Sequence, residues 1–196
     1  MRTYRTFFRC RFRYVYVTAV TAFPHDRVTF LVHCAFFKVL QKFQETFLVL
    51  LFNLRNAFEE LCNVAETNGV KIAIEVEPNQ LFHNLKRFFE VADKVNSSAF
   101  KLNFDVGHIY LSEVDIDSAI EKSKDFIVYS HIENMCMGEH CHKLPWDGEI
   151  DLLSAYKKLK EVGYDGAVSL DIYLQDYEKV SPRCIEYINN EVFSKI

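Results

Sequence analysis

From residue 51 onward, the chain switches repeatedly between apolar residues at helical spacing and short, nearly continuous apolar runs. Leu54, Phe58, Leu61 and Ala65 recur at intervals that place them on one side of a helix. This spacing predicts a helix over Leu51–Thr67, which the following Asn-Gly pair would end. The run Ile-Ala-Ile just after it is too short for a helix and predicts a buried strand.

The same reading extends to the end of the chain and gives a regular alternation. The predicted elements are the strand Val70–Val76, the helix Gln80–Val95, the strand Phe100–Phe104, the helix Asp115–Lys124, the strand Phe126–His131, a long loop over Glu133–Glu149, the helix Asp151–Glu161, the strand Gly166–Ile172 and a closing helix Tyr177–Asn190. Strands that alternate with helices of this length predict an α/β fold with a parallel sheet. Such sheets carry their active sites at the carboxyl ends of the strands.

Residues 1–50 have a different composition. They contain eight Lys/Arg, two Asp/Glu and nine of the 18 Phe. They contain no Gly, and the first Gly of the chain is Gly69. Three interpretations are open: an organelle-targeting extension, genuine strands such as the alternating Arg13–Ala19, or the remnant of a truncated or misread gene. We therefore predict an atypical basic, Phe-rich segment over 1–50 and one domain over 51–196.

Bulk composition excludes several classes of protein. The 196 residues suffice for one domain with a substantial core, and the net charge of -4 gives no reason to expect nucleic acid as a main partner. No apolar run reaches the length of a membrane span. The six Cys include no Cys-x-x-Cys pair, which predicts reduced thiols in a cytoplasmic protein.

Polar residues that can bind metal occur at the end of each predicted strand from residue 70 onward. They are Glu75, Asp105 with His108, His131, and Asp171. If the strands are parallel and curve into a barrel, these side chains converge on one point. Carboxylates and imidazoles that meet at a point form a site for a divalent metal ion.

Each of these residues also has a plain structural explanation. An Arg could pair with Glu75, Asp105 could cap the following turn, and His131 could be a structural histidine. In the long loop, His140 and His142 could bind a second metal or a substrate oxygen, or could simply be polar surface. Glu133 could orient a ligand, and Trp146 could line a pocket or pack. Their joint occurrence in this order is more specific than any one of them.

Together the motifs resemble the carboxyl-terminal half of the xylose-isomerase-like TIM-barrel superfamily, which includes sugar-phosphate isomerases and epimerases and the endonuclease IV group. The matching segments are Ile-Glu-Val-Glu-Pro at Glu75, Phe-Asp-Val-Gly-His at Asp105, Ser-His-Ile-Glu-Asn at His131, the loop from His140 to Gly-Glu-Ile-Asp, and Gly-Tyr-Asp-Gly-Ala-Val-Ser-Leu-Asp ending at Asp171. The resemblance covers about residues 51–180. It implies an incomplete (β/α)8 TIM barrel in which the last four strand-helix units are recognisable.

The resemblance also implies a chemistry. Mn²⁺, Mg²⁺ or Zn²⁺ would be held by Glu75, Asp105, His131 and Asp171, and a substrate enediolate would be stabilised by that ion. Glu75 and Asp171 would transfer the proton. The implied activity is isomerisation or epimerisation of a small sugar or sugar-like polyol. Residues expected to bind the substrate are His108, His142, Glu133 and Trp146, and further candidates for metal ligands are His108, His140 and His142.

The sequence departs from the family pattern in three places. Position 171 is Asp where Glu is usual, Trp146 stands where Gly is usual, and a full barrel needs about 250 residues. Two alternatives therefore stay open: an endonuclease IV-like metal phosphodiesterase, and an inactive barrel fragment. A half-barrel would leave two open sheet edges, which predicts self-association into a homo-oligomer, aggregation or unfolding.

Overall fold

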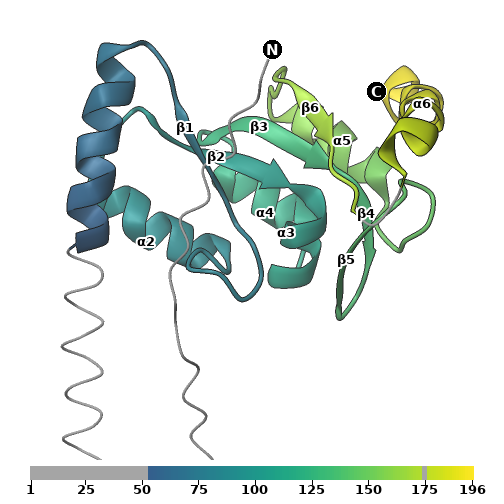
Figure 1. Cartoon of the computed structure of the whole chain (residues 1–196), viewed down its shortest axis with the longest axis horizontal. Helices are drawn as coiled ribbons and strands as arrows, with labels where there is room; N and C mark the ends of the chain where they lie inside the picture. Colours follow the sequence, from purple (N-terminus) through teal and green to yellow (C-terminus); the bar gives the residue numbers. More distant parts are fainter. Residues whose placement is uncertain (1–52, 174–175) are drawn as a thin grey trace, which may run out of the picture. The chain divides into compact units, whose positions relative to one another are not determined.

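A four-stranded parallel sheet organises the chain. The computed structural model describes residues 53–173 and 176–196. The strands are β1 (Ile72–Glu75), β2 (Phe100–Asp105), β3 (Ile127–Ile132) and β6 (Val168–Leu170), in the order β1-β2-β3-β6. The sheet does not close on itself within the described residues (Figure 1). The predicted α/β fold with parallel strands is therefore confirmed.

Helices precede, connect and follow the strands. They are a helix over residues 53–67, α2 (Leu85–Val95), α3 (Val106–Ser112), α4 (Ile116–Ser123), α5 (Leu152–Glu161), α6 (Tyr177–Tyr187), a π-helical turn (Ile188–Val192) and a 3-10 turn (Phe193–Lys195). Asp residues begin two of the predicted helices: Asp115 accepts a hydrogen bond from Ser118 N at 2.8 Å, and Asp151 from Ser154 N at 2.9 Å. Such caps satisfy N–H groups that have no partner inside the helix.

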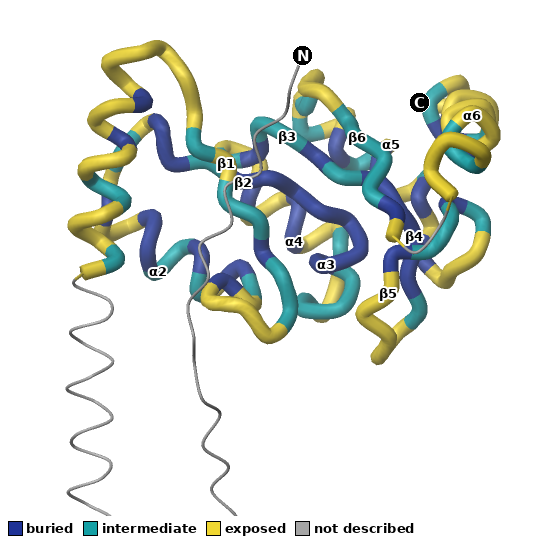
Figure 2. Tube along the Cα trace, viewed as in Figure 1, coloured by how far each residue is buried: buried dark blue, intermediate teal, exposed yellow. Residues whose placement is uncertain are grey.

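One face of the sheet forms the hydrophobic core. On β2, the side chains of Phe100, Leu102 and Phe104 are at most 1% exposed. The buried positions in Figure 2 run along β2 and into the start of α3. The Phe100 ring contacts the rings of Phe58 and Phe88, with centroids 5.1 and 5.4 Å apart. The core thus joins the helix over 53–67 and α2 to the sheet.

Replacing Phe100 by Ala is expected to destabilise the fold by about 3–5 kcal/mol, because it removes a fully buried ring and leaves a cavity. The free energy of unfolding in urea would measure this loss. Leu81 is 42% exposed, so Leu81→Ala serves as the control and should change stability by less than about 0.5 kcal/mol. Equal effects of the two substitutions would contradict the packing described here.

The other face of the sheet carries polar residues, and the strand register brings them together. Glu75 pairs with Asn103 across β1 and β2, and Asp105 pairs with His131 across β2 and β3. Because side chains alternate between faces along a strand, Asn103 and Asp105 share the face opposite the core. This arrangement gathers the predicted site residues at the carboxyl ends of the strands.

Three local predictions were wrong: the start of one helix, the absence of strands from the long loop, and the absence of a helix directly after β2. The helix predicted from Gln80 begins at Leu85, because Asn84 caps it by accepting a hydrogen bond from Arg87 N at 2.9 Å. The predicted loop over 133–149 contains an antiparallel hairpin, β4 (Asn134–Cys136) and β5 (Glu139–Lys143). Its turn uses Gly138 at φ +81°, a conformation that glycine adopts without strain.

Helix α3 was also not predicted, since the sequence suggested only a tight turn after β2. It forms because Asp105 acts as its N-cap, with its carboxylate accepting a hydrogen bond from His108 N at 2.8 Å. His108 therefore sits on a defined helical turn beside the sheet.

The atypical segment predicted over 1–50 lies outside the described residues. Within the part of the chain that the structure describes, no helix combines the length and the apolar character needed to cross a membrane.

Candidate metal centre

Three carboxylates surround one imidazole at the carboxyl edge of the sheet. His131 Nδ1 lies 3.3 Å from Asp105 Oδ2, 3.4 Å from Asp171 Oδ2 and 3.6 Å from Glu75 Oε1. We call Glu75, Asp105, His131 and Asp171 the four-residue cluster; one ligand atom from each lies within 4.8 Å of all the others. The structure thus brings together the four residues that the sequence singled out as the main metal ligands.

The donor atoms of this cluster fit a divalent ion. Asp105 Oδ2 is buried, and no partner among the described residues gives it a hydrogen bond of good geometry. Donors about 2.0–2.2 Å from a tetrahedrally bound ion are roughly 3.3–3.6 Å from one another, close to the separations between His131 Nδ1 and the three carboxylates. Three carboxylates and an imidazole also suit Mn²⁺, Mg²⁺ or Zn²⁺ chemically.

Asn103 orients one of these carboxylates, and the sequence analysis missed it. Its Nδ2 donates a hydrogen bond to Glu75 Oε2 at 3.1 Å, while Glu75 Oε1 faces the imidazoles. Asn103 is only 6% exposed. An Asn two residues before Asp105 on the same strand was the signal, because residues two apart share a face.

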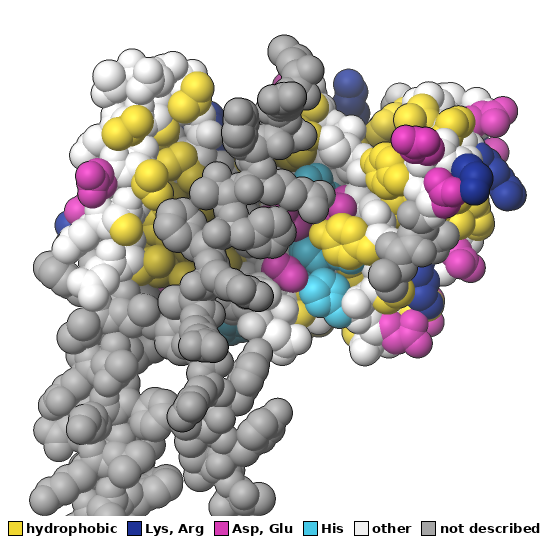
Figure 3. Space-filling view, viewed as in Figure 1, with side chains coloured by type: hydrophobic (Ala, Val, Ile, Leu, Met, Phe, Trp, Pro, Cys, Tyr) yellow, Lys and Arg dark blue, Asp and Glu magenta, His cyan; other side chains and the backbone are white. Residues whose placement is uncertain are grey.

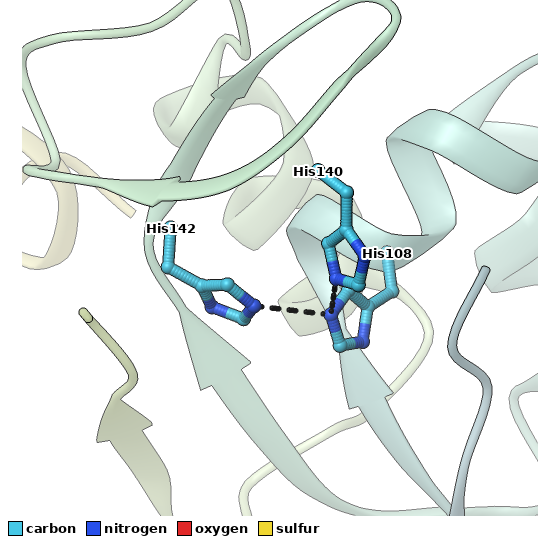
Figure 4. A group of neighbouring side chains, drawn as sticks. All are labelled: His108, His140 and His142. Atoms are coloured by element: carbon cyan, nitrogen blue, oxygen red, sulfur yellow. Dashed lines mark hydrogen bonds between the residues drawn. The ribbon is translucent and has the colours of Figure 1, made fainter. Parts of the chain in front are cut away.

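Three histidines form a second cluster beside the first. His108 Nε2 lies 3.0 Å from His140 Nε2 and 3.2 Å from His142 Nε2, and Figure 4 shows the rings pointing toward one another. We call these residues the histidine cluster; His108 comes from α3, and the other two come from β5. Because His140 and His142 are two residues apart on one strand, their side chains lie on the same side of the hairpin.

The two clusters are in contact. His108 Nδ1 lies 3.2 Å from Glu75 Oε1 and 3.5 Å from Asp105 Oδ1, and His142 Nδ1 lies 3.7 Å from Asp171 Oδ2. In the space-filling view, His and acidic side chains lie side by side near the middle of the visible face (Figure 3). A ligand at one cluster would therefore be within reach of groups from the other.

Mutual contacts set the protonation of these groups. Burial disfavours charge on Glu75, but its contacts with His108 and His131 outweigh this and lower its pKa. Burial likewise opposes a charge on His131, yet contacts with Asp105, Asp171 and Glu75 raise its pKa to about 12. Burial alone would raise the pKa of Asp171, but the contact with His131 outweighs burial, so the pKa is lowered. Protonated His131 thus carries the positive charge that a metal ion would otherwise supply.

The metal-free protein is expected to be most stable at mildly acidic pH. The raised pKa of His131 gives stability that is fully present below its ordinary value of 6.5 and is lost as pH rises toward about 12. The lowered pKa values of Glu75 and Asp171 give stability that is present above their ordinary values of 4.5 and 3.8 and is lost in acid. Urea unfolding in EDTA at a series of pH values would measure both losses. A His131→Gln variant should show a weaker decline on the alkaline side, and an unchanged decline would contradict this account.

Two of the predicted substrate-binding residues, Glu133 and Trp146, have contacts of their own, and a carboxylate oxygen of Glu133 lies within 4.8 Å of ligand atoms of Asp105 and His142. Glu133 is completely buried, and its Oε1 accepts a hydrogen bond from Gly107 N at 2.7 Å. Burial, followed by the charge of Asp105, raises its pKa well above the ordinary range. Trp146 packs on Tyr187, with ring centroids 5.4 Å apart, and under the guanidinium of Arg183 at 4.6 Å. These described contacts of Trp146 are with α6, not with the two clusters.

Tyr173 is a further residue near the clusters that the sequence did not suggest. Its ring centroid lies 4.0 Å from that of His142, and its hydroxyl donates a long hydrogen bond of 3.4 Å to Asp171 Oδ2. It is 52% exposed, so it forms part of the accessible border of the site.

Comparison with known proteins identifies the family of the chain. A family profile described as a xylose isomerase-like TIM barrel matches residues 39–188. The chain therefore belongs to the xylose isomerase-like TIM-barrel family.

Individual relatives cover part of the chain. Inosose isomerase of Bacillus subtilis is 27% identical over 130 residues, which are 62% of this chain and 47% of that protein. D-psicose 3-epimerase of Ruminiclostridium cellulolyticum is 25% identical over 119 residues, 59% of this chain and 39% of the relative. The solved structure of the IolI protein with a bound zinc atom is 25% identical, with a TM-score of 0.57 over 69% of this chain and 52% of that one. The chain spans about half the length of the curated relatives it matches.

Proposed function

We propose that this chain carries the metal-binding half of an isomerase or epimerase that acts on a small sugar or sugar-like polyol. The observation that carries the proposal is the four-residue cluster, in which one donor atom from or next to each of the four parallel strands lies within 4.8 Å of the others. The related inosose isomerase and D-psicose 3-epimerase support the substrate class. The zinc atom in the IolI structure supports the use of a metal.

In this proposal, Glu75, Asp105, His131 and Asp171 hold the ion. When bound, a divalent ion withdraws electron density from a substrate carbonyl and stabilises the negative charge that develops as a neighbouring C–H proton leaves. Binding would also replace the proton on His131, because a metal-bound imidazole must be neutral.

Glu75 and Asp171 would move the substrate proton. Both have lowered pKa values, so both are ionised at neutral pH and able to accept a proton. They come from β1 and from the residue after β6, the two outermost strands of the sheet, so they flank His131 from opposite sides. One could remove a proton from one face of a substrate carbon while the other returns it to the opposite face.

His108 and His142 would contact substrate oxygens. Burial lowers the pKa of His142, so its ring is neutral at pH 7 and can donate or accept a hydrogen bond. Its Nδ1 lies 3.1 Å from the backbone oxygen of Asp171, which leaves Nε2 to face the histidine cluster. The described ring contacts of Trp146 are with α6, and Glu133 lies near Asp105 and His142 but has no exposed surface, so neither is given the same role.

The test is proton exchange at carbon. The protein would be loaded with Mn²⁺ and incubated in D₂O with a panel of ketoses and inososes, and NMR would detect deuterium next to the carbonyl. Incorporation into one substrate class supports the proposal. A metal-loaded protein that exchanges no proton in any of these compounds would contradict it.

A metal phosphodiesterase is the second candidate, and the histidine cluster is the observation that favours it. Three imidazoles from α3 and β5 offer ligands for a second ion, as hydrolysis of phosphodiesters by paired metals requires. Two zinc ions per chain together with cleavage of an abasic-site DNA duplex would favour this reading. The net charge of -4 provides no general attraction for nucleic acid.

A further inference from the structure

Glu133 connects strand β3 to the start of helix α3. It follows β3 directly and is completely buried. Its Oε1 accepts a hydrogen bond of 2.7 Å from the backbone N of Gly107, the second residue of α3. The first N–H groups of a helix have no partner within the helix. Glu133 therefore provides, from a separate strand, the acceptor that this turn needs.

Asp105 holds the same turn from its other side. Its Oδ1 accepts a hydrogen bond from His108 N at 2.8 Å, and its Oδ2 faces His131 Nδ1 at 3.3 Å. The first turn of α3 is thus fixed by two carboxylates, one bonded to Gly107 and the other to His108. Any shift of this turn would move Asp105 and His108 together, relative to His131 on β3.

Gly107 allows Glu133 to approach so closely. A Cβ atom at this position would lie 2.2 Å from Glu133 Oε1 and 2.6 Å from Met135 Cε, both closer than real Cβ atoms come to other atoms. The glycine in Asp-Val-Gly-His is therefore explained by the approach of a buried carboxylate to the helix backbone.

We propose that Glu133 is a positioning residue: by holding the first turn of α3 against β3, it sets Asp105 and His108 in place relative to His131. The other oxygen, Oε2, is buried and has no hydrogen-bond partner among the described residues. A side chain with no exposed surface is poorly placed to bind a substrate from solution, so Glu133 acts through the residues it positions. The effect on metal binding rests on the proposed function, whereas the link between Glu133 and Gly107 does not.

Two substitutions separate the hydrogen bond from the ionisable group. Glu133→Gln keeps an oxygen that can accept from Gly107 N but removes the ionisable carboxyl group. Glu133→Ala removes the acceptor and leaves a buried N–H without a partner. The matched control is Glu113→Ala, because Glu113 Oε1 also accepts one hydrogen bond from a distant backbone group, Leu85 N, at 2.8 Å, but Glu113 belongs to neither cluster.

The first measurement is amide hydrogen exchange at Gly107 by NMR in the metal-free protein. Wild type, Glu133→Gln and the control should protect this amide, and Glu133→Ala should exchange it at least about 10-fold faster. The second is titration with Co²⁺, whose visible absorption reports the arrangement of ligands. Glu133→Ala should weaken Co²⁺ binding by about 10–100-fold, as loss of a group that orients metal ligands does, and change the spectrum, while Glu133→Gln stays within a few-fold of wild type.

Several outcomes would overturn the proposal. Protection of Gly107 that survives in Glu133→Ala would show that the hydrogen bond does not hold the turn. A Glu133→Gln variant as impaired as Glu133→Ala would show that the ionisable carboxyl group, not the hydrogen bond, matters. If Glu133→Ala fails to fold, the comparison of Glu133→Gln with wild type still decides this: loss of Gly107 protection in Glu133→Gln would overturn the proposal. Wild-type protein that binds no Co²⁺ would instead contradict the proposed function, while the exchange at Gly107 would still test the role of Glu133.

Discussion

The double variant Glu75→Ala/His131→Ala is expected to lose the bound metal almost entirely. Wild-type protein exposed to Mn²⁺ or Zn²⁺ and then desalted should retain close to one ion per chain. The variant lacks the imidazole at the centre of the four-residue cluster and one of the three carboxylates around it. Removing groups that only orient ligands weakens metal binding by about 10–100-fold. Removing two ligands should therefore weaken metal binding by more than this factor. Elemental analysis and a competition titration would measure the loss.

The control for this experiment is Glu60→Ala/His83→Ala, which removes the same residue types from exposed positions that belong to neither cluster. It should retain the metal of wild type. Equal metal in all three proteins would mean that the ion binds elsewhere. Folded wild-type protein with no metal would contradict the enzyme proposal and favour the inactive-fragment alternative, which requires no assembled site.

The second large effect is expected for Asp171→Asn. Asn keeps the size of the side chain and an oxygen that can bind metal, but it cannot accept a proton. If Asp171 exchanges a proton with the substrate, turnover should fall by about 10²–10⁴-fold, the usual contribution of a general acid or base. Steady-state kinetics at saturating Mn²⁺ would measure the fall, with bound metal determined in the same samples.

Asp176→Asn provides the comparison, because Asp176 is an exposed carboxylate that pairs only with the nearby Lys179 in the described contacts. It should leave turnover unchanged. If Asp171→Asn loses metal in proportion to activity, Asp171 is a ligand without a separate role in proton transfer. Activity that survives in a fully metal-loaded Asp171→Asn protein would assign proton transfer to Glu75 or another group.

Position 171 also shows how the family pattern is adapted in this chain. Asp is one methylene shorter than the Glu usual at this position, yet Asp171 Oδ2 reaches to 3.4 Å from His131 Nδ1. The carboxylate lies just beyond the end of β6 at Leu170, and its own backbone N donates to Ile132 O at 3.2 Å. This bond keeps the chain beside β3 after the regular strand has ended.

The sequence by itself determined the alternation of strands and helices and the residues of the four-residue cluster. Both depend on local signals: apolar periodicity sets each element, and the end of an apolar run locates each polar strand end. Glu75, Asp105 and His131 could therefore be identified before any spatial information. The parallel order of the strands followed from the length of the helices between them.

Only the tertiary structure decided how residues from separate elements meet. Asn103 was unremarked in the sequence because its role depends on the register that pairs it with Glu75. The histidine cluster required the β4–β5 hairpin, whose pairing a loop-like composition did not reveal. Glu133 and Gly107 are 26 residues apart, and their hydrogen bond exists because β3 lies beside the start of α3. Such contacts depend on packing between distant segments, which no pattern within one segment can specify.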